Sequence, residues 1–260
     1  MGGIALELKI SELGGGRPVL VLHGGGGPAT VAGLAAHLAE RNHVLLPTHP
    51  GWNGVPRPDR LDSIEDLAML YLRELHGRGW RDVLVVGSSV GGWIGAEMAW
   101  RDVARLIGGL VLIDATGVLI PDEPMPHFFS LTPRGIAEHS YYEPDKFFVD
   151  PTTLPAERLA TVRGNLATLK LLAGEPYMHD PKLLRRMEDV TIPVLAVWGD
   201  SDRIVTPRYG RAFAAAFPNA RFELVAKAGH LPQLEQPQAT FSLIDRFISD
   251  LCVIAASPQR

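Results

Sequence analysis

A serine flanked by glycines at a fixed spacing is the first feature of this sequence that could do chemistry. Gly87, Ser89 and Gly91 form a Gly-x-Ser-x-Gly pattern between a hydrophobic run and a segment of small residues. A serine on a sharp turn between a strand and a helix presents its hydroxyl clear of the sheet, and the glycines keep side chains from colliding there. Ser88 does not fit this pattern, because Val86 occupies its first glycine position. The spacing therefore predicts Ser89 as a nucleophile.

A run of glycines after another hydrophobic segment could stabilise the charge that such a nucleophile creates. His23 is followed by four glycines and Pro28, and glycines leave their backbone N–H groups unobstructed, as an oxyanion requires. A phosphate-binding loop would continue with Gly-Lys-Ser/Thr or Gly-x-Gly-x-x-Gly, and this sequence has neither. We expect the N–H groups of Gly25 and Val90 to form an oxyanion hole, with Gly26 as a neighbouring alternative. His23 is expected to brace the loop by hydrogen bonds.

His230 is the residue that could accept the proton of the serine. It follows a strand pattern and a glycine in the segment Ala228-Gly229-His230. Histidine changes charge near neutral pH and is the commonest general base. The other histidines show neither His-x-His nor His-x-x-x-His spacing, and the single Cys252 excludes a zinc site built from cysteines. We therefore expect no metal.

Strand and helix patterns that could position these residues alternate along the chain. Short apolar runs predict strands at Val19–Leu22, His43–Leu46, Val83–Val86, Leu110–Ile113, Pro193–Trp198 and Arg221–Val225. Most of these runs are unbroken, as in strands whose two faces are both covered by helices. Residues 63–75 and 241–251 carry apolar residues at helical spacing. The alternation predicts an α/β fold with a doubly wound, mostly parallel sheet.

The alternation breaks between residues 116 and 190. This stretch is rich in proline and aromatic residues and shows one clear helical pattern, roughly Pro155 to Ala173. It is too long for an ordinary connection between two elements of a compact domain. We therefore expect residues 1–115 and 191–260 to form the core, and residues 116–190 to form an inserted helical cap.

The composition excludes several classes of function. The 25 Lys and Arg residues against 29 Asp and Glu residues give a formal charge of −4 without any block of like charge. This balance argues against a nucleic acid or an anionic membrane as partner. The N-terminus lacks the pattern of a secretory signal, and no apolar run approaches the roughly 20 residues of a membrane-spanning helix. We expect a cytoplasmic protein that acts on a small molecule, with a homodimer as the assembly to test.

Taken together, these motifs resemble the α/β-hydrolase family. Four segments carry the resemblance: His23-Gly24-Gly25-Gly26, Gly87-Ser88-Ser89-Val90-Gly91-Gly92, Trp198-Gly199-Asp200-Ser201-Asp202 and Ala228-Gly229-His230. Their chain order, serine then acid then histidine, is that of the family. The resemblance implies that Asp202 holds His230 in the right tautomer and stabilises its cationic form. Asp114, which follows a predicted strand, is the alternative acid, and Asp200 is expected to shape the turn.

The resemblance implies a serine hydrolase that needs no cofactor. Its leading reaction is hydrolysis of a small or medium apolar carboxylic ester through an acyl-enzyme on Ser89. The alternative on the same triad is hydrolysis of a carbon–carbon bond in a meta-cleavage-type diketone. A ligand-binding protein without catalysis is the alternative from another class. Substrate contacts are expected from Phe128 and Phe129 of the cap, whose aromatic residues could equally form the core of the cap itself. Trp52, in a loop that resembles one found in the family, is expected either to contact the substrate or to pack this loop.

Overall fold

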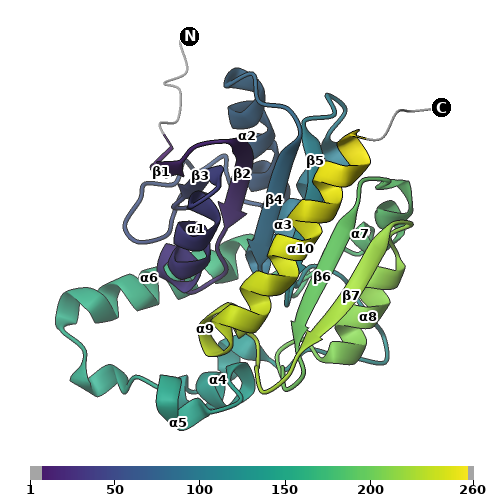
Figure 1. Cartoon of the computed structure of the whole chain (residues 1–260). Helices are drawn as coiled ribbons and strands as arrows, with labels where there is room; N and C mark the ends of the chain where they lie inside the picture. The colour runs from purple at the N-terminus through teal and green to yellow at the C-terminus, as the bar shows by residue number, and fades with distance from the viewer. Residues whose placement is uncertain (1–7, 257–260) are drawn as a thin grey trace.

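The strands of this protein form one sheet that is parallel except at one edge. The computed structural model describes residues 8–256, and seven strands are found in this part of the chain. They are β1 (Ile10–Gly14), β2 (Arg17–Leu22), β3 (Asn42–Pro47), β4 (Val83–Ser88), β5 (Ile107–Ile113), β6 (Val194–Gly199) and β7 (Ala220–Val225). Their order across the sheet is β1-β3-β2-β4-β5-β6-β7, and only β1 with β3 is antiparallel (Figure 1).

Helices cover both faces of the sheet. The described residues contain α1 (Ala32–Ala39), α2 (Ile64–Gly77), α3 (Val90–Arg101), α4 (Pro133–Ser140), α5 (Pro144–Phe147), α6 (Ala156–Ala173), α7 (Leu183–Arg186), α8 (Pro207–Ala215), α9 (Pro232–Glu235) and α10 (Pro237–Ala256). Helices α1 and α10 pack on one face, and α2, α3 and α8 pack on the other (Figure 1). Within residues 8–256, none of these helices is both long and apolar enough to cross a membrane.

Successive side chains of the central strands belong to two separate hydrophobic clusters, one on each face of the sheet. In β2, Val19 and Val21 belong to the cluster that contains Ile244 of α10. Leu20 and Leu22 of the same strand belong to the cluster under α2 and α3. Successive side chains of a strand point to opposite faces, so a strand with helices on both sides must be apolar at every position. The predicted doubly wound α/β sheet is therefore confirmed.

All six predicted strands are present, and one strand was not predicted. Strand β1 lies at the edge of the sheet, and most of its side chains are exposed. Its five residues, ISELG, contain no apolar run, so periodicity could not reveal it. Its pairing with β3, from Ile10 opposite Pro47 to Gly14 opposite His43, comes from backbone hydrogen bonds that carry no sequence signature.

Residues 116–190, called the inserted segment below, connect β5 to β6 and contain α4, α5, α6 and α7. The helix expected at 155–173 is α6. Figure 1 shows α4, α5 and α6 beyond the ends of the strands, below the sheet in this view. None of the seven strands lies in the inserted segment. This position places its helices over the edge of the sheet where Ser89 lies.

The turn that carries Ser89 is strained and closely packed. Ser89 lies between β4 and α3 with φ 56° and ψ −121°, a left-handed conformation that non-glycine residues rarely adopt. A Cβ atom at Gly87 would lie 2.2 Å from the carbonyl oxygen of Gly91, and one at Gly91 would lie 2.2 Å from that of Leu22. Both glycines are therefore required by close backbone approach, as the Gly-x-Ser-x-Gly pattern predicted.

We expect Gly91→Ala to destabilise the protein by about 2 kcal/mol or more, because its methyl group would collide with a backbone carbonyl of β2. Gly164→Ala is the matched control, because Gly164 lies exposed in the interior of α6 with open space around it. It should stabilise the protein by about 0.5–1 kcal/mol through helix propensity. Urea unfolding of both variants measures the difference, and equal effects would contradict the close packing at Gly91.

Candidate active site

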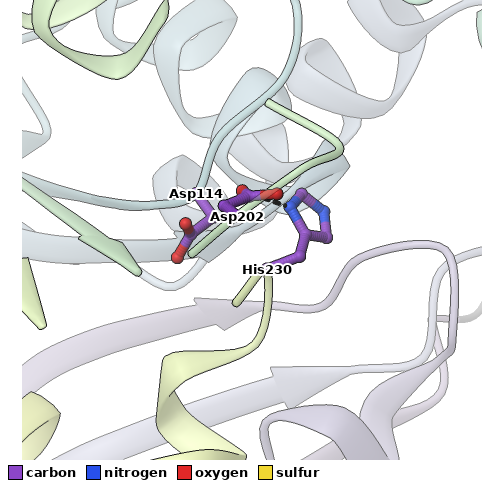
Figure 2. Close-up of side chains that lie close together, drawn as sticks. All are labelled: Asp114, Asp202 and His230. Atoms are coloured by element: carbon purple, nitrogen blue, oxygen red, sulfur yellow. Dashed lines mark hydrogen bonds and ion pairs between the residues drawn. The ribbon is translucent and has the colours of Figure 1, made fainter. Parts of the chain in front are cut away.

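Ser89, His230 and Asp202 form a continuous chain of hydrogen bonds. The Oγ atom of Ser89 lies 2.9 Å from Nε2 of His230, and Nδ1 of His230 lies 2.8 Å from Oδ2 of Asp202. Figure 2 shows the second of these bonds, with the imidazole beside the carboxylate of Asp202. All three side chains are buried, with exposed fractions of 8%, 7% and 3% for Ser89, His230 and Asp202. The structure thus brings together the three residues that the motifs predicted.

Asp202 is held by the turn that follows β6. Its Oδ1 atom accepts hydrogen bonds from the backbone N–H groups of Ile204, at 2.7 Å, and Val205, at 3.2 Å. This leaves Oδ2 for the imidazole of His230. Because three donors converge on one buried carboxylate, the negative charge is stabilised at this position. Asp200 shapes the turn, as expected, by accepting a hydrogen bond from the N–H of Lys227.

The backbone of His230 is fixed by the inserted segment. The N–H of His230 donates to the carbonyl oxygen of Ser140, at the end of α4, over 2.7 Å. Glu235 joins the same two regions, because one carboxylate oxygen accepts from the N–H of Gly229 and the other accepts from the N–H of Tyr142. The position of the imidazole therefore depends on the packing of α4 against the loop after β7.

Asp114, the alternative acid, does not contact His230 by a hydrogen bond. It follows β5, is fully buried, and accepts a hydrogen bond from the N–H of Gly199 on Oδ1 at 3.0 Å. Burial, together with the neighbouring charge of Asp202, raises the pKa of Asp114 well above its ordinary value. Figure 2 places Asp114 next to Asp202. Of the two candidate acids, Asp202 is the one that bonds the imidazole.

The glycine loop after β2 lies against Ser89, where the motif predicted it. Gly25 and Val90 both line the cavity that Ser89 faces. Val90 is the first residue of α3, so its N–H has no partner within the helix. The carbonyl oxygen of Gly25 accepts a hydrogen bond from Nε1 of Trp52 at 3.0 Å, which fixes the orientation of the loop.

A buried network of His23, His49 and Tyr71 supports this loop. Nε2 of His23 accepts from the backbone N–H of His49, so Nδ1 of His23 carries the proton and donates to the carbonyl of Gly24. Nε2 of His49 donates to the carbonyl of His23, so its Nδ1 accepts from the hydroxyl of Tyr71. The bracing role predicted for His23 is confirmed. No pattern in the sequence indicated that His49 and Tyr71 take part in this network.

Both histidines of this network are neutral. Burial lowers the pKa of His49 from 6.5 to about 4. Burial and the adjacent His49 lower the pKa of His23 well below 6.5. The two ring centroids lie 3.7 Å apart. A second proton on either ring would therefore place a positive charge against the other imidazole in a buried environment, which is unfavourable. The neutral forms are the ones that the hydrogen bonds of the loop require.

A largely apolar cavity of about 270 Å³ opens above Ser89. Its walls are Gly24, Gly25, Gly26, Thr30, Ser89, Val90, Thr116, Phe128, Ile136, Ser140, Tyr141, Val162, Asn165, Leu166, Leu169, Met178, Ile204, His230 and Leu231. Among these described wall residues there is no Lys, Arg, Asp or Glu. The sequence-based prediction identified Phe128 but missed most of the wall, because the wall is assembled from segments that lie far apart in the sequence.

Two of the three expected substrate contacts, Trp52 and Phe129, do not line this cavity. Trp52 is fully buried beneath the glycine loop and does not line the cavity. Its aromatic ring instead packs edge-on against His23, with ring centroids 5.8 Å apart. Phe129 also lies outside the cavity wall and packs edge-on against Phe128 and Tyr177. Composition identified apolar aromatic residues correctly, but it could not tell which of two neighbours faces the cavity.

Helix α6 forms one wall of the cavity and contacts the glycine loop directly. Asn165 accepts a hydrogen bond from the N–H of Asn53 and donates one to the side chain of Asn53. A Cβ atom at Gly25 would lie 2.9 Å from Leu169. Val162 and Leu166 of this helix line the open cavity and are 50% and 37% exposed.

Two groups of side chains in residues 8–256 bring three potential metal-ligand atoms together. One consists of Asp114, Asp202 and His230. In this group, Asp202 and His230 are hydrogen-bonded to each other as part of the triad. The other consists of Glu65, Glu97 and Asp180. In that second group, Arg101 and Arg186 supply the positive charge by pairing with the carboxylates.

A family model described as "Alpha/beta hydrolase family" matches residues 19–243, which is most of the chain. The protein therefore belongs to the alpha/beta hydrolase family. The matched region includes most of β2, the strands β3 to β7 and the inserted segment. The family and the fold that the four motifs implied are thus confirmed, as is the expectation of a hydrolase.

Similar proteins include hydrolases of two kinds. A 2-hydroxy-6-oxononadienedioate/2-hydroxy-6-oxononatrienedioate hydrolase from Pseudomonas putida is 28% identical over 272 residues, covering 95% of this chain and 93% of the relative. The meta-cleavage product hydrolase CumD from Pseudomonas fluorescens IP01 matches with a TM-score of 0.76 at 17% identity, over 94% of each chain. A thermophilic esterase from Thermogutta terrifontis matches with a TM-score of 0.69 at 21% identity, over 94% and 93%. The two structural matches show the fold alone.

We expect the contribution of His49 to the free energy of unfolding to fall as the pH drops from 6.5 to 4, because the unfolded chain binds a proton at His49 that the folded protein excludes. This fall is roughly 3 kcal/mol. His49→Gln should remove that part of the pH dependence. His76→Gln is the matched control, because His76 is exposed on α2 and its replacement should leave the dependence unchanged. Urea unfolding at several pH values measures both slopes. An unchanged slope in His49→Gln would contradict the buried neutral network.

Proposed function

We propose that this protein hydrolyses small or medium apolar carboxylic esters through a covalent acyl-enzyme on Ser89. The observation that carries the proposal is the unbroken chain of hydrogen bonds from Ser89 through His230 to Asp202, which opens onto an apolar cavity. A serine next to a histidine that is held by a carboxylate is the arrangement that makes a hydroxyl nucleophilic.

In the proposed reaction, Nε2 of His230 takes the proton of Ser89 as the Oγ atom attacks the ester carbonyl. Asp202 stabilises the resulting imidazolium by accepting its Nδ1–H. The N–H groups of Gly25 and Val90 stabilise the oxyanion of the tetrahedral intermediate. His230 then gives its proton to the leaving alcohol. A water molecule, activated by His230 in the same way, releases the acid from Ser89.

We infer that the inserted segment acts as the cap of the substrate cavity, over a core of residues 1–115 and 191–260. Helices α4 and α6 supply Ile136, Val162, Leu166 and Leu169 to the cavity wall. These side chains would contact the acyl chain or the alcohol of the substrate. A cavity of about 270 Å³ suits a substrate of a few carbon atoms on each side of the scissile bond.

A carbon–carbon bond hydrolase is the second candidate, and the names of the relatives favour it. The relative from Pseudomonas putida acts, by its name, on a dienedioate, which carries two carboxylate groups. A buried carboxylate needs a positive partner or several hydrogen-bond donors. The described residues of the cavity wall include no Lys or Arg. The missing cationic partner favours a neutral ester over a dicarboxylate for this chain.

Two further expectations concern the location of the protein in the cell and its assembly. A cytoplasmic location and a homodimer are both proposals from the sequence. Cell fractionation tests the first, and the mass of the native protein in solution tests the second.

We expect 4-nitrophenyl butanoate to be hydrolysed with a kcat/KM roughly a hundredfold or more above that of the matched 4-nitrophenyl ester with a terminal carboxylate, because the described cavity wall offers that charge no Lys or Arg. Ser89→Ala should lower turnover of the neutral ester by at least about a thousandfold. Steady-state kinetics of both proteins with both esters measure these ratios.

Two results would contradict the proposed ester substrate. Faster cleavage of a meta-cleavage-type diketone carboxylate than of any neutral ester would favour the carbon–carbon bond hydrolase. Tight binding of an apolar ligand without turnover in the intact protein would favour the non-catalytic alternative. Esters of graded acyl length, tested in parallel, prevent a poor choice of substrate from being read as inactivity.

A further inference from the structure

One buried carboxyl group beside the triad has no place in the reaction described above. Asp114 follows β5 directly, and its N–H extends the sheet by donating to the carbonyl of Val197 over 3.0 Å. Its Oδ1 atom accepts from the N–H of Gly199 at the end of β6. The backbone therefore fixes Asp114 at the junction of two parallel strands, directly behind the turn that carries Asp202.

The second oxygen of Asp114 has no hydrogen-bond donor among the described residues. Its neighbour is another carboxyl group, since oxygens of Asp114 and Asp202 and a ring nitrogen of His230 all lie within 4.8 Å of one another. Figure 2 shows these three side chains as one cluster. Two carboxylate oxygens are both acceptors, so they can satisfy each other only when one of them carries a proton.

The surroundings decide which of the two carboxyl groups carries that proton. Asp202 accepts from two backbone N–H groups and from His230, so three donors stabilise its negative charge. Asp114 accepts from a single N–H group. Asp202 and Glu235 are the charged groups that act on Asp114, and both disfavour its ionisation. Burial acts in the same direction, and together they raise the pKa of Asp114 well above 3.8.

We propose that Asp114 is a positioning residue: its neutral carboxyl group donates a hydrogen bond to the carboxylate of Asp202 and acts on His230 through it. The proposal rests on the proposed function of the triad. Its O–H group gives Asp202 a fourth donor, which holds that carboxylate in place against the imidazole. It also keeps a second negative charge away from His230.

Asp114→Asn tests the proposal with little structural change. Its side-chain carbonyl can accept from Gly199, and its NH₂ group can donate to Asp202, as the neutral acid would. Asp114 has φ 43°, a conformation that asparagine tolerates well. If the wild-type group is neutral, the folded protein holds a proton that the unfolded chain releases above pH 3.8. We therefore expect the variant to gain stability over the wild type as the pH rises from about 4 to 8.

Urea unfolding across this pH range provides the readout, and it requires no substrate. A stability difference between Asp114→Asn and the wild type that is independent of pH would overturn the proposal, because it would show that Asp114 ionises alike in both states. This measurement remains decisive if the protein proves inactive on every ester. Failure of the proposed function and failure of this inference are therefore distinguishable.

The pH profile of ester hydrolysis tests the effect on His230. Asp114→Asn should keep the acidic limb of kcat/KM in place, because a neutral group replaces a neutral group. Asp114→Gly fits the same backbone conformation but removes the donor, so kcat should fall about tenfold, with KM changed by less than about twofold. An acidic limb that moves to lower pH in Asp114→Asn would overturn the proposal. So would an equal loss of kcat in both variants.

Discussion

The hydrogen bond between Ser89 and His230 depends on three separate parts of the chain meeting at one edge of the sheet. Ser89 follows β4, Asp202 follows β6 and His230 follows β7, and these strands are parallel to one another. Parallel strands end at the same edge, so side chains from distant segments converge there. The strained conformation of Ser89 then turns its hydroxyl toward the imidazole, and glycines at positions 87 and 91 make that conformation sterically accessible.

The inserted segment does more than enclose the cavity, because it contacts both sides of the site. Ser140 fixes the backbone of His230 through a hydrogen bond. On the other side of the site, Leu169 packs against Gly25 of the glycine loop, and Asn165 bonds to Asn53. A shift of α4 would move the imidazole, and a shift of α6 would move the loop that carries Gly25. The same helices that line the cavity thus also fix the backbone of His230 and pack against the glycine loop.

The sequence predicted the sheet and the triad because both leave local signals. Unbroken apolar runs marked the central strands, and glycines required by close packing marked the turn of Ser89. The edge strand β1 left no such signal, and neither did the network of His49 and Tyr71, whose members come from different elements. The sequence left two roles open for Trp52 for a similar reason, since an apolar ring beside the site can line a cavity or pack beneath the loop that borders it. The positions of β1, of the network of His49 and Tyr71, and of Trp52 depend on tertiary packing, which leaves no local pattern in the sequence.

Covalent labelling of Ser89 tests most directly whether the triad activates this hydroxyl. The purified protein is treated with a fluorophosphonate, and its intact mass is measured beside that of Ser89→Ala. We expect a single adduct on the wild type and none on the variant, because His230 and Asp202 activate this hydroxyl alone. An unlabelled wild type, or an adduct that persists in Ser89→Ala, would show that Ser89 is not the activated nucleophile.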